Sequence, residues 1–224
     1  MFRGIKVFIV CAFKYYFFDM KKILLILSII SFLFSAKVHA SAFDEHFSFL
    51  VNADDIDYIG EAVSQKQHAL QAAFHAERSG ADEATIIAAL LHDVGHLIPG
   101  ADTADMEGCG ACNHEKTGAD YLRKIGLPEK VAILVEGHVE AKRYRVYKYP
   151  DYYETISPAS KTTFKYQNGI MTDEEAHAFE QDPYFEGKMN IRIWDEQAKN
   201  PDAVVPGFDH YEGMFLRCLA GTHA

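Results

Sequence analysis

From Asp54 onwards, apolar residues recur along the chain at helical spacing. No segment shows the regular alternation of apolar and polar residues that is typical of half-buried strands. Capping residues and helix-stopping glycines and prolines divide the pattern into segments. The predicted helices cover residues 60–78, 82–97, 113–125, 128–143, 172–181, 185–199 and 210–219. The pattern therefore predicts an all-α fold, with loop or irregular chain over residues 100–112 and 144–153.

The first 40 residues differ from the rest of the chain. An uncharged apolar run over residues 23–35 follows two lysines and is too short to span a bilayer comfortably. Together with small residues at Val38 and Ala40, just before Ser41, it predicts a secretory signal peptide over residues 1–40 and export, to the periplasm if the source is a Gram-negative bacterium. Met20 lies directly before the two lysines, so one interpretation is that the given start is over-extended and that the true start is Met20. A longer leader or an uncleaved anchor is the other interpretation. A cytoplasmic protein is expected if the segment does not act as a signal.

Composition limits the functions that the chain can have. Its 224 residues are 49% hydrophobic and 24% charged, which suits one domain, residues 41–224, with a sizeable core. Lys and Arg total 22 against 32 for Asp and Glu, and the net charge of -10 argues against binding nucleic acid or anionic membranes through bulk charge. An anionic small molecule would therefore need a local basic pocket. The sequence does not fix an oligomeric state.

The pair His92-Asp93 lies near the end of a strongly apolar predicted helix. Burying two adjacent ionisable groups without partners is costly, and a bound metal ion would remove that cost. A buried histidine bonded to the backbone is the simpler explanation of any single case. However, neighbouring predicted helices supply four more side chains of the ligand type, a pattern typical of helical metal sites: His68, His114, His138 and Asp195.

The number of these candidates indicates two metal ions. Four imidazoles and two carboxylates exceed the needs of one tetrahedral ion, and a carboxylate such as Asp93 can bridge two ions. Nitrogen and oxygen ligands without thiolate favour iron or manganese. The alternative is that these are unrelated core and surface residues.

The order of these six residues resembles the HD-domain superfamily, and specifically its dinuclear branch. Three further stretches are similar to the phosphonate-degrading oxygenases of that branch, the PhnZ-like 2-amino-1-hydroxyethylphosphonate dioxygenase family: residues 58–71, 157–160 and 209–211. The resemblance runs from about Asp54 to the C-terminus. It implies an all-helical bundle that holds a mixed-valent Fe(II)/Fe(III) centre and uses dioxygen to cleave the carbon–phosphorus bond of a 1-hydroxyalkylphosphonate, such as 2-amino-1-hydroxyethylphosphonate to glycine and phosphate.

The resemblance also implies roles for individual residues. The substrate-binding iron would be held by His68, His92, Asp93 and Asp195. The other iron would be held by Asp93, His114 and His138, so Asp93 would bridge both. Tyr58 and Glu61 would form a lid, in which the tyrosine occupies the open iron position until substrate displaces it and the glutamate helps to recognise the substrate's amine. The phosphonate would be bound by His96, Lys142, Ser160 and Arg192.

Helical spacing gives independent support for two of the phosphonate-binding residues. Lys142 lies one turn after His138, and Arg192 lies one turn before Asp195, so each cation is expected on the same side of its helix as a ligand. Surface cations at such spacing also occur by chance. His96, one turn after His92, is equally suited to orient a metal ligand.

Two other functions use the same ligands. A dinuclear HD phosphohydrolase, with manganese or another divalent metal, would attack phosphate esters or nucleotides through metal-bound hydroxide. Tyr58, Glu61 and the 157–160 segment argue against it, because a hydrolase has no evident need for them. A non-catalytic phosphonate or metal binder is the third alternative.

Cys109 and Cys112 form a Cys-x-x-Cys motif just before His114 that the resemblance does not explain. The main interpretations are a small loop disulfide or two free thiols. A third metal site or a redox switch is the further alternative.

Overall fold

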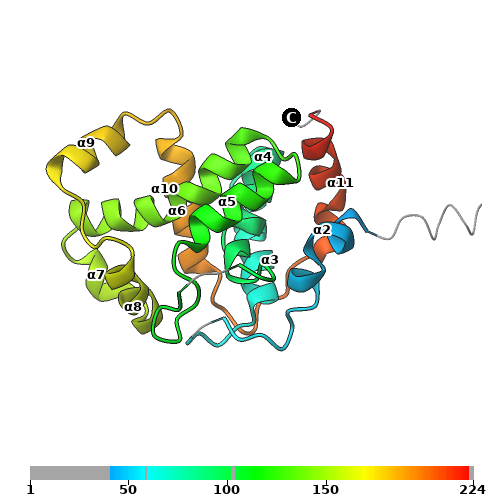
Figure 1. Ribbon diagram of the computed structural model, residues 1–224, viewed down its shortest axis with the longest axis horizontal. Helices are drawn as coiled ribbons and strands as arrows, with labels where there is room; N and C mark the ends of the chain where they lie inside the picture. The colour runs from blue at the N-terminus through cyan, green and yellow to red at the C-terminus, as the bar shows by residue number, and fades with distance from the viewer. Residues whose placement is uncertain (1–40, 59, 102–103, 222–224) are drawn as a thin grey trace, which may run out of the picture. The chain divides into compact units, whose positions relative to one another are not determined.

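The computed structural model describes residues 41–58, 60–101 and 104–221. Apart from two isolated β-bridges, all regular secondary structure in these residues is helical, which confirms the predicted all-α fold (Figure 1). In chain order the elements are α2 (Ala42–Val51), α3 (Gln65–Arg78), α4 (Glu83–Leu91), the 3₁₀ turn η1 (Val94–His96), α5 (His114–Lys124), α6 (Glu129–Lys148), α7 (Tyr152–Thr155), α8 (Pro158–Tyr166), α9 (Asp173–Glu180), α10 (Phe185–Gln197) and α11 (Phe208–Leu219). The predicted signal peptide lies outside the described residues.

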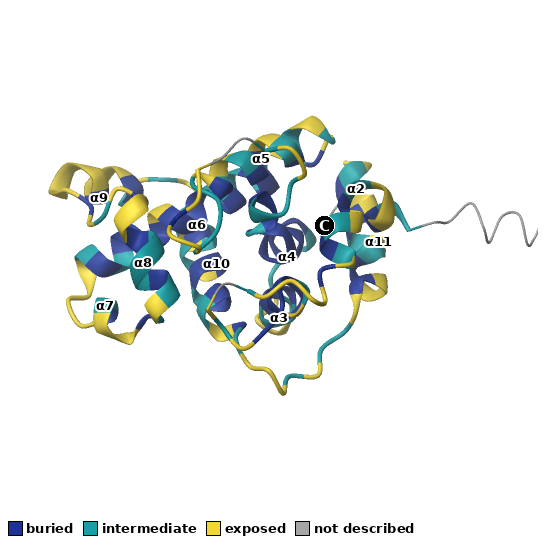
Figure 2. Ribbon diagram, turned by 60° about the horizontal axis from the view of Figure 1, so that its bottom comes forward, coloured by how far each residue is buried: buried dark blue, intermediate teal, exposed yellow. Residues whose placement is uncertain are grey.

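The central element is α4, which Figure 2 shows in dark blue among its neighbours. Every residue from Ala84 to Leu91 is buried, and α3, α6, α10 and α11 all pack against the helix. A helix without a polar face can only be stable when it is surrounded on all sides. The burial of α4 fixes its C-terminal end, where His92 and Asp93 follow directly.

Two helix boundaries near that end differ from the prediction. The helix predicted over residues 82–97 ends at Leu91, and Asp93 adopts φ -102° and ψ 9° before the η1 turn. The helix predicted from residue 60 begins at Gln65, because Ser64 caps it: Ser64 Oγ accepts the Gln67 N–H, and Gln67 Oε1 accepts the Ser64 N–H. At the start of α3 the capping box therefore overrides the apolar spacing.

Four helical segments were not predicted: α2, α7, α8 and the end of α6 beyond residue 143. In α6 the tyrosine-rich stretch stays helical because Tyr144 packs against Phe179 and Phe185. The start of α8 has a local signal, since Ser157 caps it and proline follows at the first helical position. Packing of α2 against α11 stabilises the N-terminal end of the unit Ala42–Ala224.

The η1 turn and α5 approach each other through two glycines, Gly95 and Gly118. A Cβ on Gly95 would overlap the His114 carbonyl and lie 2.8 Å from Gly118 N, and both atoms belong to the backbone. Because neither can move without shifting α5, this contact sets how close His96 lies to His114.

We expect Gly95→Ala to destabilise the fold by about 3 kcal/mol or more, at the upper end of the cost of overpacking a core. Chemical denaturation would measure the loss. The matched control is Gly213→Ala in the interior of α11, where the added Cβ meets the end of the Arg217 side chain at 3.3 Å. That substitution should stabilise the helix by about 0.5–1 kcal/mol. Equal stability of the two variants would contradict the tight contact.

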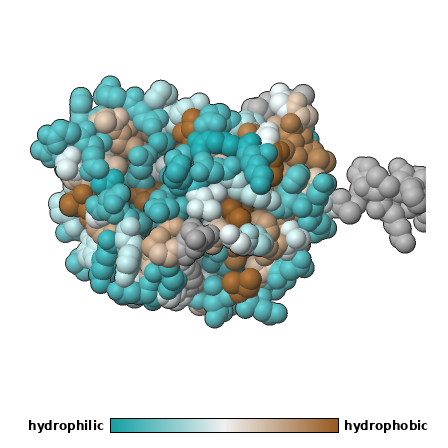
Figure 3. Space-filling model, in the orientation of Figure 1, coloured by the Kyte–Doolittle hydropathy of each residue, from teal (hydrophilic) through white to brown (hydrophobic). Residues whose placement is uncertain are grey.

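On the face shown in Figure 3, polar residues predominate, and apolar side chains gather in small separate groups. In the described part of the chain, the exposed large hydrophobic residues include Ile170, Val204 and Leu216, which lie far apart in sequence. No helix among the described residues is long and apolar enough to cross a membrane.

Candidate metal centre

Five helices bring six potential ligands to one place. His92 and Asp93 follow α4, and the others come from four different helices: His68 from α3, His114 from α5, His138 from α6 and Asp195 from α10. The four histidines and Asp195 are buried, and the Asp93 side chain is 10% exposed. The structure therefore brings together all six residues that the sequence singles out as ligands.

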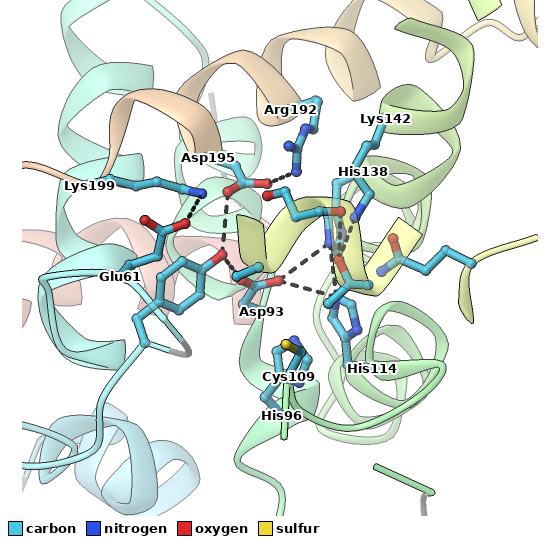
Figure 4. A pocket seen from close by; sticks show the side chains of 15 residues that line it. Glu61, Asp93, His96, Cys109, His114, His138, Lys142, Arg192, Asp195 and Lys199 are labelled. Atoms are coloured by element: carbon cyan, nitrogen blue, oxygen red, sulfur yellow. Dashed lines mark hydrogen bonds and ion pairs between the residues drawn. The ribbon is translucent and has the colours of Figure 1, made fainter. Parts of the chain in front are cut away.

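Asp93 lies between two pairs of histidines, and Figure 4 shows one of these pairs, His114 and His138. Its Oδ2 is 3.5 Å from His68 Nε2 and 3.4 Å from His92 Nε2. Its Oδ1 is 3.3 Å from His114 Nε2 and 3.4 Å from His138 Nε2. The result is two compact ligand groups that share one carboxylate. This arrangement suits a dinuclear site with a bridging aspartate.

The hydrogen bonds of the histidines test whether a metal fits. Nδ1 of His68, His92 and His138 each donates to a backbone carbonyl, at 2.9, 2.8 and 2.6 Å. A carbonyl only accepts, so Nδ1 of each ring carries a proton and Nε2 is the nitrogen that faces the centre. Yet the Nε2 atoms stand in pairs 3.1 Å apart, His68 with His92 and His114 with His138. Two ring nitrogens this close need a shared proton or a cation beside them, so the residues fit metal binding.

The pKa shifts at the centre agree with this requirement for positive charge. Burial lowers the pKa of His68 to about 4, so this ring is neutral. Burial would also lower the pKa of His92, but the charge of Asp93 raises it to about 9. Burial opposes ionisation of Asp93, yet the charge of His92 and hydrogen bonds from the other histidines hold its pKa well below the usual range. The carboxylate is thus ionised and ready to bind cations.

Tyr58 covers the Asp93 side of the centre. Its hydroxyl donates to Asp93 Oδ2 at 2.9 Å, with Asp195 Oδ1 at 3.4 Å, and its ring stacks on His68 with centroids 3.7 Å apart. Burial, followed by the charges of the two aspartates, raises the pKa of Tyr58 well above 10, so the phenol stays a donor. Asp195 Oδ1 also lies 3.6 Å from His68 Nε2, while its Oδ2 accepts from Arg192.

A cavity opens beside the centre, with about 430 Å³ of space including its mouth. The predicted substrate-binding residues His96, Lys142, Ser160 and Arg192 all line it, as do Tyr58 and Glu61. Lys142 Nζ donates to Thr163 Oγ1 at 2.9 Å, and burial together with the charge of Arg192 lowers the Lys142 pKa to about 7. Among the described residues, Arg192 Nη2 is buried without a hydrogen-bond partner. Two buried cations, one with an unused donor, suit an anionic ligand.

His96 can serve the cavity as a neutral donor. Its Nδ1 accepts the Ala111 N–H at 3.0 Å, and its ring stacks on His114 with centroids 3.8 Å apart. Burial and the neighbouring His114 lower the His96 pKa well below 6.5, so the ring is neutral and its single proton lies on Nε2. The stacking also holds the His114 ring in place.

The cavity is also lined by four residues that the sequence analysis did not assign to it: Cys109, Thr163, Gln167 and Lys199. Lys199 pairs with Glu61 at 2.7 Å. It lies four residues after Asp195, the same spacing that drew attention to Lys142 after His138, so a signal was present. Cys109 and Cys112 are free thiols, without a disulfide between them.

The fold and these distances define a class: a helical metalloprotein with two histidine groups sharing one aspartate. Residues 66–178 match the family model described as HD domain. The chain is 40% identical over 165 residues to uncharacterized protein L432 of Acanthamoeba polyphaga mimivirus, covering 73% of this chain and 75% of that protein.

Two relatives have functional names. The [1-hydroxy-2-(trimethylamino)ethyl]phosphonate dioxygenase (glycine-betaine-forming) of Leisingera caerulea is 36% identical over 165 residues, covering 74% of this chain and 84% of its own length. The hydroxymethylphosphonate dioxygenase of Gimesia maris is 37% identical over 165 residues, covering 72% of this chain and 81% of its own length. The chain therefore belongs to the HD-domain family, and within it to the PhnZ-like oxygenases that its sequence resembles. This membership confirms the resemblance and makes the chain an enzyme.

Proposed function

We propose that the protein is a di-iron oxygenase that cleaves the carbon–phosphorus bond of a 1-hydroxyalkylphosphonate with dioxygen. The observation that carries the proposal is the cavity, which places two buried cations, Lys142 and Arg192, beside a pair of ligand groups that share Asp93. In a chain of net charge -10, such a pocket is a dedicated site for a small anion. Two relatives of this chain are named as dioxygenases of phosphonates, one with and one without a trimethylamino group. The names therefore leave the side chain of the substrate open.

In this proposal His68, His92, Asp93 and Asp195 hold one ion, and Asp93, His114 and His138 hold the other. Mixed-valent iron held there would supply the redox chemistry that oxidation by dioxygen requires.

The remaining roles belong to the chain's own side chains. Lys142, Arg192, Ser160 and the Nε2 proton of His96 bind the phosphonate oxygens. Tyr58 leaves the two aspartates when substrate enters, and its phenol keeps its proton because burial raises its pKa. The surrounding helices exclude water from the reacting atoms.

The test uses protein that has been loaded with iron under anaerobic conditions and then mixed with hydroxymethylphosphonate or 2-amino-1-hydroxyethylphosphonate. We expect dioxygen uptake and phosphate release to rise together in equal amounts with at least one of these substrates. Phosphate release from phosphate esters without dioxygen uptake would contradict the oxygenase and support the phosphohydrolase. Tight phosphonate binding without turnover would contradict the proposed reaction.

We also propose, from their sequence alone, that residues 1–40 export the protein. A processed chain that begins at Ser41 in a periplasmic fraction would support export. A full-length chain confined to the cytoplasm would contradict it.

A further inference from the structure

At one side of the cavity, an ion pair joins Glu61 and Lys199 (Figure 4). Lys199 Nζ donates to Glu61 Oε1 at 2.7 Å and lies 3.4 Å from Ser157 Oγ. It also lies over the Tyr58 ring, 5.7 Å from the centroid. Both side chains are largely shielded, with exposed fractions of 17% for Lys199 and 13% for Glu61. A shielded pair of this kind is screened less by salt than a surface pair.

The backbone on both sides of Lys199 is fixed to α3. The carbonyl of Ala198 accepts from His68 Nδ1 at 2.9 Å. The Gln71 side chain bonds both backbone groups of Asn200, with the Asn200 N–H donating to Oε1 at 3.1 Å and Nε2 donating to the Asn200 carbonyl at 3.0 Å. The lysine is therefore built into the cavity wall by the same segment that orients a metal ligand.

The charges that line the cavity lie on two sides. Figure 4 shows Lys142, His138 and Arg192 on one side of Asp93, and Glu61 with Lys199 on the other. Among the described residues that line the cavity, Glu61 is the only carboxylate besides Asp93 and Asp195. Because Lys199 already neutralises Glu61, that side offers no free negative charge to a ligand.

We propose that Lys199 determines specificity by occupying the acidic position of the cavity, so that the substrate is a 1-hydroxyalkylphosphonate without a cationic side chain. This inference rests on the proposed function and narrows its substrate class. A cationic side chain beside Glu61 would lie next to the charge of Lys199, and two positive charges close together in a shielded site repel each other. An uncharged side chain meets the lysine stem and the Tyr58 ring without breaking the ion pair.

The sharpest test compares two substrates of the same size and shape. In (1-hydroxypropyl)phosphonate a methyl group replaces the ammonium group of 2-amino-1-hydroxyethylphosphonate. We expect kcat/KM of the iron-loaded enzyme to be at least about tenfold higher for the propyl compound. Anaerobic titration of the same protein, in which no turnover occurs, should give dissociation constants in the same order, which provides a readout besides activity.

Variants then assign the preference to the ion pair. Lys199→Met keeps the apolar stem and frees Glu61. It should shift the ratio of the two kcat/KM values, propyl over amino substrate, by at least about tenfold towards the amino substrate. Lys199→Arg keeps the charge and should keep the wild-type ratio. Adding Glu61→Gln to Lys199→Met should remove the gain, since the freed carboxylate is lost. The matched control is Lys161→Met on α8, whose ion pair with Glu154 lies at the surface and should leave the ratio unchanged.

The outcomes separate this inference from the proposed function. Turnover of either phosphonate with matched dioxygen uptake supports the function. A preference for the amino substrate, or a ratio that Lys199→Met does not move, would then overturn the role of Lys199 alone. If the iron-loaded enzyme turns over no phosphonate, the function fails and the inference fails with it.

Discussion

Replacing Asp93 with alanine is expected to remove both metal ions and to abolish turnover. Each carboxylate oxygen faces its own pair of histidines, at 3.3–3.5 Å. Without the carboxylate, each ion loses a shared ligand and the negative charge that balances it. Loss of even an outer-shell partner typically costs 10–100-fold in metal affinity, so loss of a bridging ligand should cost more than about 100-fold at each site. Metal analysis of the purified variant after dialysis measures the ions that are left.

The control for this experiment is Asp120→Ala, which removes an exposed carboxylate from α5 and should keep both ions. His68→Ala is the informative intermediate, because it removes a ligand from one group only and should leave metal at His114 and His138. Two ions retained by Asp93→Ala would contradict the shared site. Loss of both ions from His68→Ala as well would show that the two groups bind metal only together.

The meeting of six candidate ligands could be predicted from sequence, because neighbouring predicted helices each supply a histidine or an aspartate. A histidine and an aspartate at the end of an apolar helix stand out, and helical spacing then extends the set to Lys142 and Arg192. Lys199 has the same four-residue spacing from Asp195, but α10 ends at Gln197, so helical spacing does not set where its side chain points. The position of the Lys199 side chain depends on hydrogen bonds of Ala198 and Asn200 to α3, and these bonds join residues about 130 positions apart. Local patterns carry no information on such contacts.

The fold was predictable where local signals, apolar spacing together with capping and stop residues, decide it, as in α5 and α9. The prediction was wrong where packing interrupts a pattern. Apolar residues continue beyond Leu91, but the helix stops there, and Gly95 lets the following turn lie against α5. This break is also what turns Asp93 towards all four histidines. The sequence pattern therefore locates the centre, while long-range packing sets its geometry.

Lys142→Met is expected to keep both metal ions and to raise KM about 10- to 100-fold. The substitution keeps the volume of the stem and removes the charge, and a hydrogen bond to a charged group contributes about 1.5–3 kcal/mol. Metal content and the thermal unfolding temperature should stay close to those of the wild type, because Lys142 contacts Thr163 and no potential ligand directly. Lys148→Met, near the exposed end of the same helix, is the matched control and should leave KM unchanged. An unchanged KM in Lys142→Met would contradict its role in phosphonate binding.

The pH dependence of kcat/KM distinguishes this role from a structural one. Burial and the charge of Arg192 lower the Lys142 pKa to about 7 in the free protein, and only the protonated ammonium attracts the phosphonate. As pH rises through about 7, the charged fraction falls, so kcat/KM should fall; a bound anion favours the charged form, so kcat should change less. In Lys142→Met this fall should disappear, leaving only the ionisation of the substrate itself. A lysine that only filled space would give the variant and the wild type the same pH profile.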